Sequence, residues 1–157
     1  MKVIYEQFTG KENVLIFPGI NSCSVLVAAI GGGQLVGAHF SYKTETNRRF
    51  RMLKNVVRDM GSASVSSMYF VGVFRFWPHL RTVVGECKTV LGYNEQVYTY
   101  DLKLKEGKSL ALKAWPIGSQ ARLGSTKDLE WKTIDEGNRL PSSTDFKELK
   151  RSKYVVM

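Results

Sequence analysis

The segment that most constrains the fold spans residues 22–42. Two runs of small and branched apolar residues, Ser22–Ile30 and Gln34–Tyr42, are separated by three consecutive glycines, Gly31–Gly33. Two such runs joined by a short glycine loop predict a β-hairpin, and a loop at these glycines places Val25 opposite His39. Neither run alternates cleanly between apolar and polar residues, so we expect both faces of the hairpin to be covered.

The elements around this hairpin predict an α+β fold. Segments with helical spacing of apolar residues alternate with short runs of branched and aromatic residues. We expect strands at Lys2–Thr9, Asn13–Phe17 and Met68–Phe76, helices at Glu45–Met60 and Pro78–Leu91, and a second hairpin of Gln96–Lys105 and Ser109–Ile117. Beyond Gly118 the pattern weakens to a short strand at Leu129–Ile134 and a terminal helix opened by Asp145 and Glu148. The predicted architecture is a layered, β-sandwich-like sheet core with two helices.

The length of 157 residues fits a single domain. We place its core at about residues 13–118 and treat residues 119–157 as a C-terminal extension of the same domain. Residues 1–10 lack the apolar stretch of a signal peptide, and no apolar run reaches the length of about 18 residues that a membrane span needs. We therefore expect a monomer that is cytoplasmic, or exported by a signal-independent route.

The formal net charge of +9 is unevenly distributed along the chain. Residues 1–42 are balanced, with Lys2 and Lys11 against Glu6 and Glu12, so the basic excess begins at residue 43. A positive surface favours acidic proteins, nucleic acid or anionic lipid as partners. The basic residues of the first predicted helix, Arg48, Arg49 and Arg51, are candidates for docking such a partner.

The first hairpin also carries a candidate pair for chemistry. Cys23 and Val25 are two residues apart on one strand and share a face, so Cys23 and His39 become diagonal neighbours at roughly 7–8 Å. In nucleophilic catalysis a thiolate attacks a carbonyl carbon while an imidazole gives and takes protons. The turn before the cysteine, including Asn21 and Ser22, can aim backbone N–H groups at a developing oxyanion. The competing interpretation is a buried cysteine that packs as a small hydrophobe.

The sequence offers no metal or cofactor motif. There is no CxxC or HExxH, and His39 and His79 lack the spacing of metal ligands. The second cysteine, Cys87, falls on the apolar stripe of a predicted helix and is assigned to packing, although one disulfide to Cys23 stays open at this point. We expect no metal and no organic cofactor.

The motif around the pair resembles a known enzyme family. The letters G-I-N-S-C-S-V at residues 19–25, followed by G-A-H at residues 37–39, are similar to the G-x-x-S-C and A-H pattern of the chemoreceptor glutamine deamidase CheD. That family belongs with the catalytic domains of cytotoxic necrotizing factor-type deamidase toxins. The likeness, judged by element order, covers roughly residues 17–118. It implies a layered fold and a cysteine-dependent hydrolase that converts glutamine side chains of a protein substrate to glutamate, with Cys23 as nucleophile and His39 as general acid and base.

Two departures from the family pattern concern the same site. CheD has a threonine six residues before its cysteine that orients the histidine, whereas this chain has Phe17. The toxin branch is thought to use a backbone carbonyl for that task, so a backbone group, Ser41 or Asn21 could orient His39 here. Asn21 also replaces a glycine of the family's turn. These changes favour a divergent bacterial toxin or effector over a chemotaxis enzyme.

Two other functional classes stay open. One is a non-catalytic basic module that binds nucleic acid or an acidic protein, and the other is a Cys-His protease or transglutaminase. Because the site-bearing segment is balanced in charge and the basic excess starts directly after it, we interpret the basic residues as a docking face for an acidic protein substrate. Nucleic acid is then the alternative partner, not an obligate one.

Overall fold

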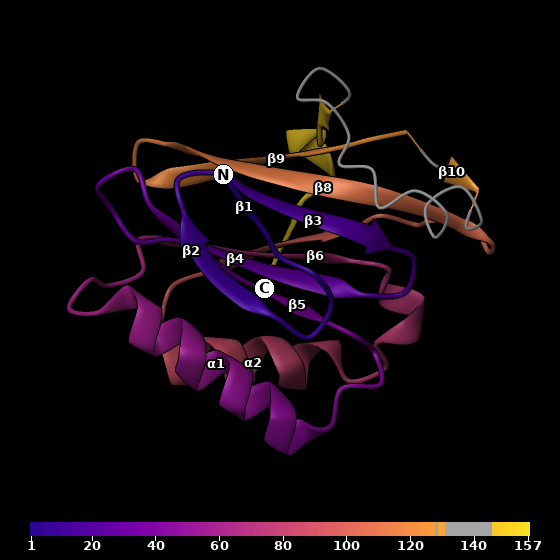
Figure 1. Ribbon diagram of the computed structural model, residues 1–157. Helices are drawn as coiled ribbons and strands as arrows, with labels where there is room; N and C mark the ends of the chain where they lie inside the picture. The colour runs from indigo at the N-terminus through magenta and orange to yellow at the C-terminus, as the bar shows by residue number, and fades with distance from the viewer. Residues whose placement is uncertain (128, 131–145) are drawn as a thin grey trace.

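Two β-sheets and two α-helices form three layers in the residues that the computed structural model describes, which are 1–127, 129–130 and 146–157 (Figure 1). The strands are β1 (Lys2–Val3), β2 (Thr9–Glu12), β3 (Leu15–Ile20), β4 (Ser24–Ala29), β5 (Leu35–Phe40), β6 (Ser67–Gly72), β7 (Val97–Asp101), β8 (Lys108–Ile117), β9 (Gln120–Ser125), β10 (Leu129–Glu130), β11 (Lys147–Glu148) and β12 (Val155–Val156). The helices are α1 (Thr46–Met60) and α2 (Leu80–Leu91).

Each sheet draws strands from distant parts of the chain. Sheet A has the order β1-β3-β8-β9-β11, with β10 paired to β8, and sheet B has the order β12-β7-β6-β4-β5-β2. The pairs β1·β3 and β6·β7 are parallel, and the other pairs are antiparallel. The α+β, sandwich-like architecture predicted from the sequence is confirmed.

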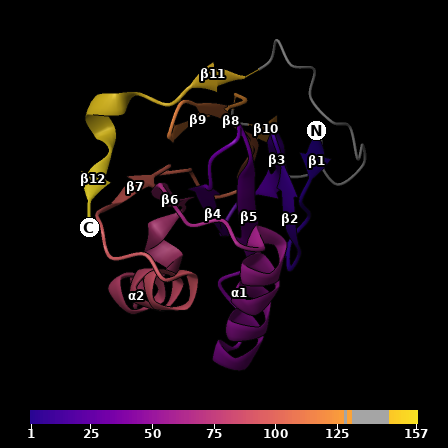
Figure 2. The same cartoon turned by 90° about the vertical axis from the view of Figure 1, so that its left-hand side faces the viewer.

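The predicted first hairpin is the centre of sheet B. Strands β4 and β5 pair in the expected register, with Val25 opposite His39, and every residue of both strands is buried. One face of the sheet packs against sheet A, and α1 and α2 cover the other (Figure 2). Burial on both faces explains why neither strand alternates between apolar and polar residues.

The two helices present apolar stripes to sheet B. The buried residues of α1 are Met52, Leu53, Val56 and Met60, and those of α2 are Val83, Val84, Cys87 and Leu91. Their spacing of three and four residues places each set on one side of its helix. Within the described ranges, neither helix combines the length and the apolar character that crossing a bilayer would require.

The second predicted hairpin is wrong. Strand β7 pairs with β6 and β12 in sheet B, whereas β8 lies in sheet A between β3 and β9. The chain turns away at the end of β7, where the Asp101 carboxylate accepts hydrogen bonds from the backbone N–H groups of Phe74 and Lys103, and Lys103 has a φ of 49°. Alternation of apolar residues predicts which side chains share a face of a strand, but it does not identify the neighbouring strand. The hairpin that does form joins β8 to β9.

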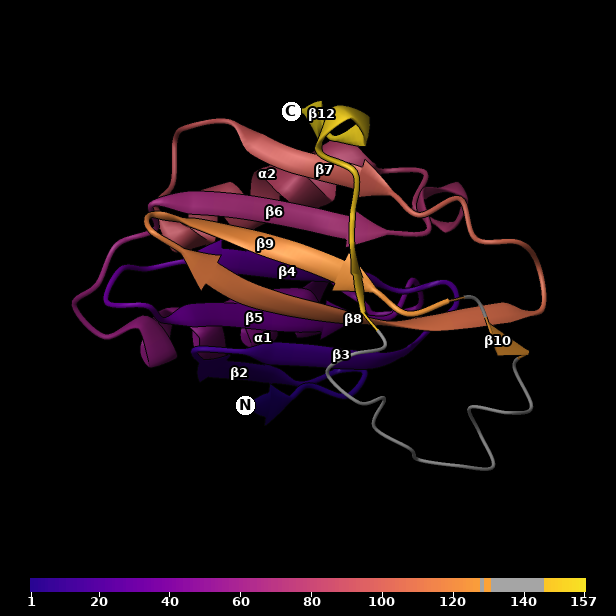
Figure 3. The same cartoon turned by 90° about the horizontal axis from the view of Figure 1, so that it is seen from above.

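Residues beyond 118, which we treated as an extension, contribute to both sheets. They supply β9 and β11 to sheet A and β12 to sheet B, and the C-terminal segment crosses from one sheet to the other (Figure 3). The predicted strand at Leu129–Ile134 is present as β10, and its remainder lies outside the described residues. The predicted terminal helix is wrong at Glu148, which is in β11, while Asp145 lies outside the described residues.

Candidate active site

The hairpin loop fixes the relative positions of Cys23 and His39. All three loop glycines have positive φ values, between 63° and 87°, which residues with a β-carbon rarely adopt. The loop closes through hydrogen bonds between Ile30 and Gln34 and between Gln34 and Gly31. This closure sets the register that pairs Val25 with His39 and places Cys23 directly before β4.

Both candidate side chains face the layer between the two sheets. Cys23 belongs to the apolar cluster there and is 1% exposed, and His39 is fully buried. The imidazole ring meets the ring of Phe17 on β3 edge to face, with the ring centroids 5.9 Å apart. The aromatic residue that replaces the expected threonine therefore packs against His39 instead of hydrogen-bonding to it.

The backbone of the N-terminal segment orients the imidazole. Nδ1 of His39 lies 2.9 Å from the carbonyl oxygen of Ile4, so Nδ1 carries the proton in the neutral ring and Nε2 is the free base. Nε2 is buried and has no hydrogen-bond partner among the described residues. Ser41 and Asn21, the side-chain candidates for orienting His39, do not do so, because Nδ1 pairs with Ile4 and Nε2 has no partner in the described part of the chain. The Ser41 hydroxyl instead accepts a hydrogen bond from the backbone N–H of Lys43.

The turn before Cys23 brings backbone donors to the thiol. The pKa of the Cys23 thiol is raised to about 12; burial is the largest cause and the Glu6 carboxylate adds to it, whereas hydrogen bonds from the backbone of Ser22 and Asn21 oppose the rise. The indole of Trp77 donates a hydrogen bond of 2.9 Å to the carbonyl of Ser22 and holds the turn in place. At neutral pH the sulfur is therefore a protonated thiol in this conformation.

Glu6 is a site residue that the sequence analysis missed. Its negative charge raises the pKa of the Cys23 thiol and also acts on His39. Burial lowers the pKa of His39, while the Ile4 carbonyl and Glu6 oppose that change. Glu6 and Ile4 come from the segment between β1 and β2, which was expected to be one continuous strand. No motif in the sequence marks either residue.

A pocket of about 480 Å³ opens beside this turn and is lined by Glu6, Asn21 and Ser22. The rest of the lining is Ser41, Tyr42, Lys43, Arg75, Phe76, Lys105, Glu106, Gly107 and Lys108. Four of these residues are basic and two are acidic, so the pocket carries a net positive charge. The Arg75 guanidinium stacks over the ring of Phe76, 4.7 Å from its centroid, and donates a hydrogen bond to the carbonyl of Leu104.

The predicted docking arginines do not line this pocket. Arg49 pairs with Glu86 of α2 at 3.1 Å, and the two side chains are only 14% and 13% exposed, so this pair joins the helices. Arg48 and Arg51 are exposed and line a separate groove beside Gln7–Thr9. The basic residues that line the pocket are instead Lys43, Arg75, Lys105 and Lys108, the last of which begins β8.

No protein-family model matches this chain, and a search of curated proteins finds no match either. Among the residues that the structure describes, no cluster of three or more histidine, cysteine or acidic side chains could hold a metal ion. The site is therefore described by its own geometry: a cysteine directly before β4, a histidine on the paired strand β5, backbone donors at the thiol, and a basic pocket beside the turn that precedes the cysteine.

Proposed function

We propose that the chain is a cysteine-dependent protein-glutamine deamidase of the toxin or effector type. The observation that carries this proposal is the orientation of His39: its Nδ1 is held by the Ile4 carbonyl, and its Nε2 is left without a partner. A backbone carbonyl in this role is what the resemblance to the toxin branch leads us to expect. The same arrangement leaves Nε2 able to exchange protons with a substrate.

The proposed reaction uses Cys23 and His39 in two steps. His39 takes the thiol proton at Nε2, and the thiolate attacks the carboxamide carbon of a substrate glutamine. The same proton passes from Nε2 to the leaving nitrogen as the C–N bond breaks, which releases ammonia and leaves a thioester. Neutral His39 then takes a proton from water, which hydrolyses the thioester to glutamate and restores the thiol. The backbone N–H groups of Asn21 and Ser22 stabilise the negative charge on the oxygen of each tetrahedral intermediate.

Access to the thiol involves Glu6 in this proposal. Cys23 is 1% exposed, while Glu6 is exposed at the rim of the pocket and its charge raises the pKa of the thiol. A glutamine side chain that enters from the pocket must pass the Glu6 carboxylate to reach Cys23. Movement of the carboxylate away from the sulfur lowers the pKa of the thiol, so substrate entry and formation of the thiolate are coupled.

Ammonia release from glutamine peptides tests this proposal. The panel contains peptides with acidic residues beside the glutamine, since the pocket is positively charged, and mass spectrometry detects the gain of about one mass unit that accompanies conversion to glutamate. We expect Cys23→Ala to reduce release to background and His39→Ala to reduce it by about a hundredfold or more.

The matched control is Cys87→Ala, which removes the other buried thiol and should retain activity. Deamidation that persists in Cys23→Ala would contradict the proposal, as would a panel that stays unmodified by folded wild-type protein. Release of an amine-exchanged or cleaved peptide, instead of the glutamate product, would identify a transglutaminase or a protease.

The burial of both side chains favours a second candidate, a basic module that binds an acidic protein without catalysis. In that case Cys23 and His39 are packing residues, and Lys43, Arg75 and Lys105 bind acidic side chains at the pocket. Binding of a glutamate-rich peptide would then weaken steeply with salt and would be the same in wild type and Cys23→Ala.

A further inference from the structure

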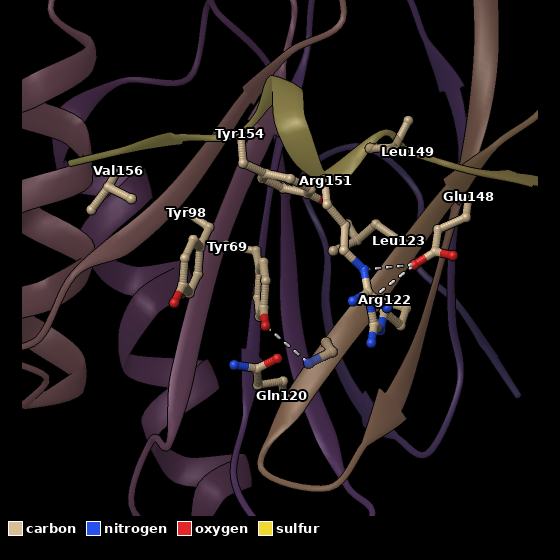
Figure 4. Close-up of a pocket in the computed structure, with 11 residues that line it drawn as sticks. Tyr69, Tyr98, Gln120, Arg122, Leu123, Glu148, Leu149, Arg151, Tyr154 and Val156 are labelled. Atoms are coloured by element: carbon tan, nitrogen blue, oxygen red, sulfur yellow. Dashed lines mark hydrogen bonds and ion pairs between the residues drawn. The ribbon is translucent and has the colours of Figure 1, made fainter.

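A second pocket shares no lining residue with the pocket beside the turn before Cys23. It has a volume of about 280 Å³ and is enclosed by β6 and β7 of sheet B, β9 of sheet A and the C-terminal segment (Figure 4). Its aromatic and polar lining residues are Tyr69, Tyr98, Tyr154, Gln120, Arg122, Glu148 and Arg151. Ala121, Leu123, Leu149 and Val156 complete it.

Three tyrosines form a fixed aromatic wall in this pocket. The rings of Tyr69 and Tyr98 are stacked with their centroids 5.4 Å apart, and Tyr154 meets each of them edge to face at 6.3 and 6.4 Å. The Tyr69 hydroxyl accepts a hydrogen bond of 3.1 Å from the backbone N–H of Ala121, which ties the wall to β9. Burial raises the pKa of Tyr154, so its hydroxyl is neutral. Rings held in this way offer fixed aromatic faces and edges against which a planar ligand can pack face to face or edge to face.

Arg122 supplies an unused donor at the same pocket. Its Nη1 bonds to Glu148 at 3.3 Å, while its Nε is buried and has no hydrogen-bond partner among the described residues. A buried guanidinium N–H without an acceptor is costly, so a ligand oxygen that reached Nε on binding would remove that cost. Because Glu148 uses Nη1, the edge formed by Nε and Nη2 remains for a carboxylate, which arginine binds with two parallel hydrogen bonds.

The net charge of the pocket lining determines which sign of charge the ligand carries. Arg122 and Arg151 face a single carboxylate, that of Glu148, so the lining has a net positive charge. The tyrosine rings contact one another, which leaves no cage between them for a cation. An anion that carries a flat apolar body matches both halves of the lining.

We propose that this pocket binds a small planar aromatic carboxylate. The carboxylate accepts hydrogen bonds from the Nε and Nη2 edge of Arg122, and the ring lies against the tyrosine wall of Tyr69, Tyr98 and Tyr154. Leu123 and Leu149 close over the ring edge. The site is independent of Cys23, so it stands or falls separately from the deamidase proposal.

Calorimetric titration with three matched probes tests the inference. The probe is 4-hydroxybenzoate; cyclohexanecarboxylate keeps the charge without the aromatic ring, and benzamide keeps the ring without the charge. We expect saturable binding of 4-hydroxybenzoate and at least about tenfold weaker binding of both controls, since stacking and the paired hydrogen bonds each contribute.

Variants assign the binding to this pocket. Arg122→Lys keeps the positive charge but loses the two-donor edge, so the affinity for 4-hydroxybenzoate should fall by about tenfold. Tyr98 is half-buried in the aromatic wall, and Tyr98→Leu should lower the affinity as well. Arg48→Gln on α1 should leave the affinity unchanged. Circular dichroism and unfolding curves verify that each variant is folded.

Each other outcome overturns the inference. Equal binding of 4-hydroxybenzoate and cyclohexanecarboxylate excludes the aromatic wall, and binding unaffected by Arg122→Lys excludes the arginine edge. The absence of saturable binding by the folded wild-type protein at millimolar 4-hydroxybenzoate excludes the site.

Discussion

The two cysteines of this protein are equally buried and yet have different surroundings. Each is 1% exposed, and burial raises the pKa of each thiol to about 12. Cys87 lies on α2 within an apolar cluster that includes Val83, Val84 and Leu91, and the charges of the Arg49–Glu86 pair act on it. Cys23 lies at a turn whose preceding residues donate backbone hydrogen bonds to it, and the Glu6 charge acts on both Cys23 and the buried His39. Burial, pKa and a nearby carboxylate therefore do not separate a packing thiol from a candidate nucleophile, whereas the backbone donors of the turn do.

The largest expected difference between the two environments is their tolerance of a hydroxyl. Cys87→Ser places a hydroxyl in an apolar cluster and should lower the free energy of unfolding by about 2 kcal/mol. Cys23→Ser should cost less than about 1 kcal/mol, because the hydroxyl can accept hydrogen bonds from the backbone of Asn21 and Ser22. Urea unfolding curves measure both values.

The alanine variants at the same positions serve as controls, since they remove the sulfur without adding a polar group. At each position, the loss in free energy of unfolding of the alanine variant is subtracted from that of the serine variant. The difference is the contribution of the added hydroxyl. Equal hydroxyl penalties at residues 23 and 87 would show that the two environments do not differ in the way described.

The next effect is the dependence of stability on pH that His39 causes. The pKa of His39 is lowered in the folded protein, so below about pH 6.5 the unfolded chain takes up a proton that the folded chain does not. Stability is therefore fully present above pH 6.5 and falls at lower pH, by up to about 1.4 kcal/mol per pH unit until the folded pKa is reached. His39→Phe should reduce this slope, and replacement of the exposed His79 by Gln should not. An unchanged slope in His39→Phe would mean that other groups cause the pH dependence.

The smallest effect is that of the Glu6 charge on the thiol. Glu6→Gln removes a carboxylate that raises the pKa of Cys23 and does not act on Cys87. Alkylation of Cys23 near pH 8 should become several-fold faster, below the tenfold that corresponds to about one pKa unit, because Glu6 is exposed to solvent. Mass spectrometry of peptides reports the two cysteines separately. A rate at Cys23 that does not change would remove Glu6 from the site.

The sequence predicted the features that depend on local patterns. The glycine loop and the two continuous apolar runs identified the hairpin and its register, and helical spacing identified α1 and α2 to within two residues at each end. The sheet to which β7 belongs could not be predicted in this way, because a strand with alternating apolar residues is equally suited to either sheet. Its partner is decided by the turn at Asp101 and by packing across the whole domain.

Other parts of the candidate site could not be predicted from the sequence, for different reasons. Ile4 contributes only a backbone carbonyl, and any residue type has one. Glu6 reaches Cys23 through the path of an irregular segment, which has no periodicity to read. Helical spacing placed Arg49 on a polar face of α1, but it could not reveal that Glu86 of a second helix lies opposite.

Sheet B has a consequence for the oxidation chemistry of the protein. Cys23 lies on its inner side, in the cluster that faces sheet A. Cys87 belongs to α2 and lies in the cluster between the helices and the outer side of sheet B. The sheet separates the two thiols, and both are free. A Cys23–Cys87 disulfide can then form only in a chain that has lost sheet B, so refolding in an oxidising buffer would trap non-native molecules, whereas a reducing buffer would not.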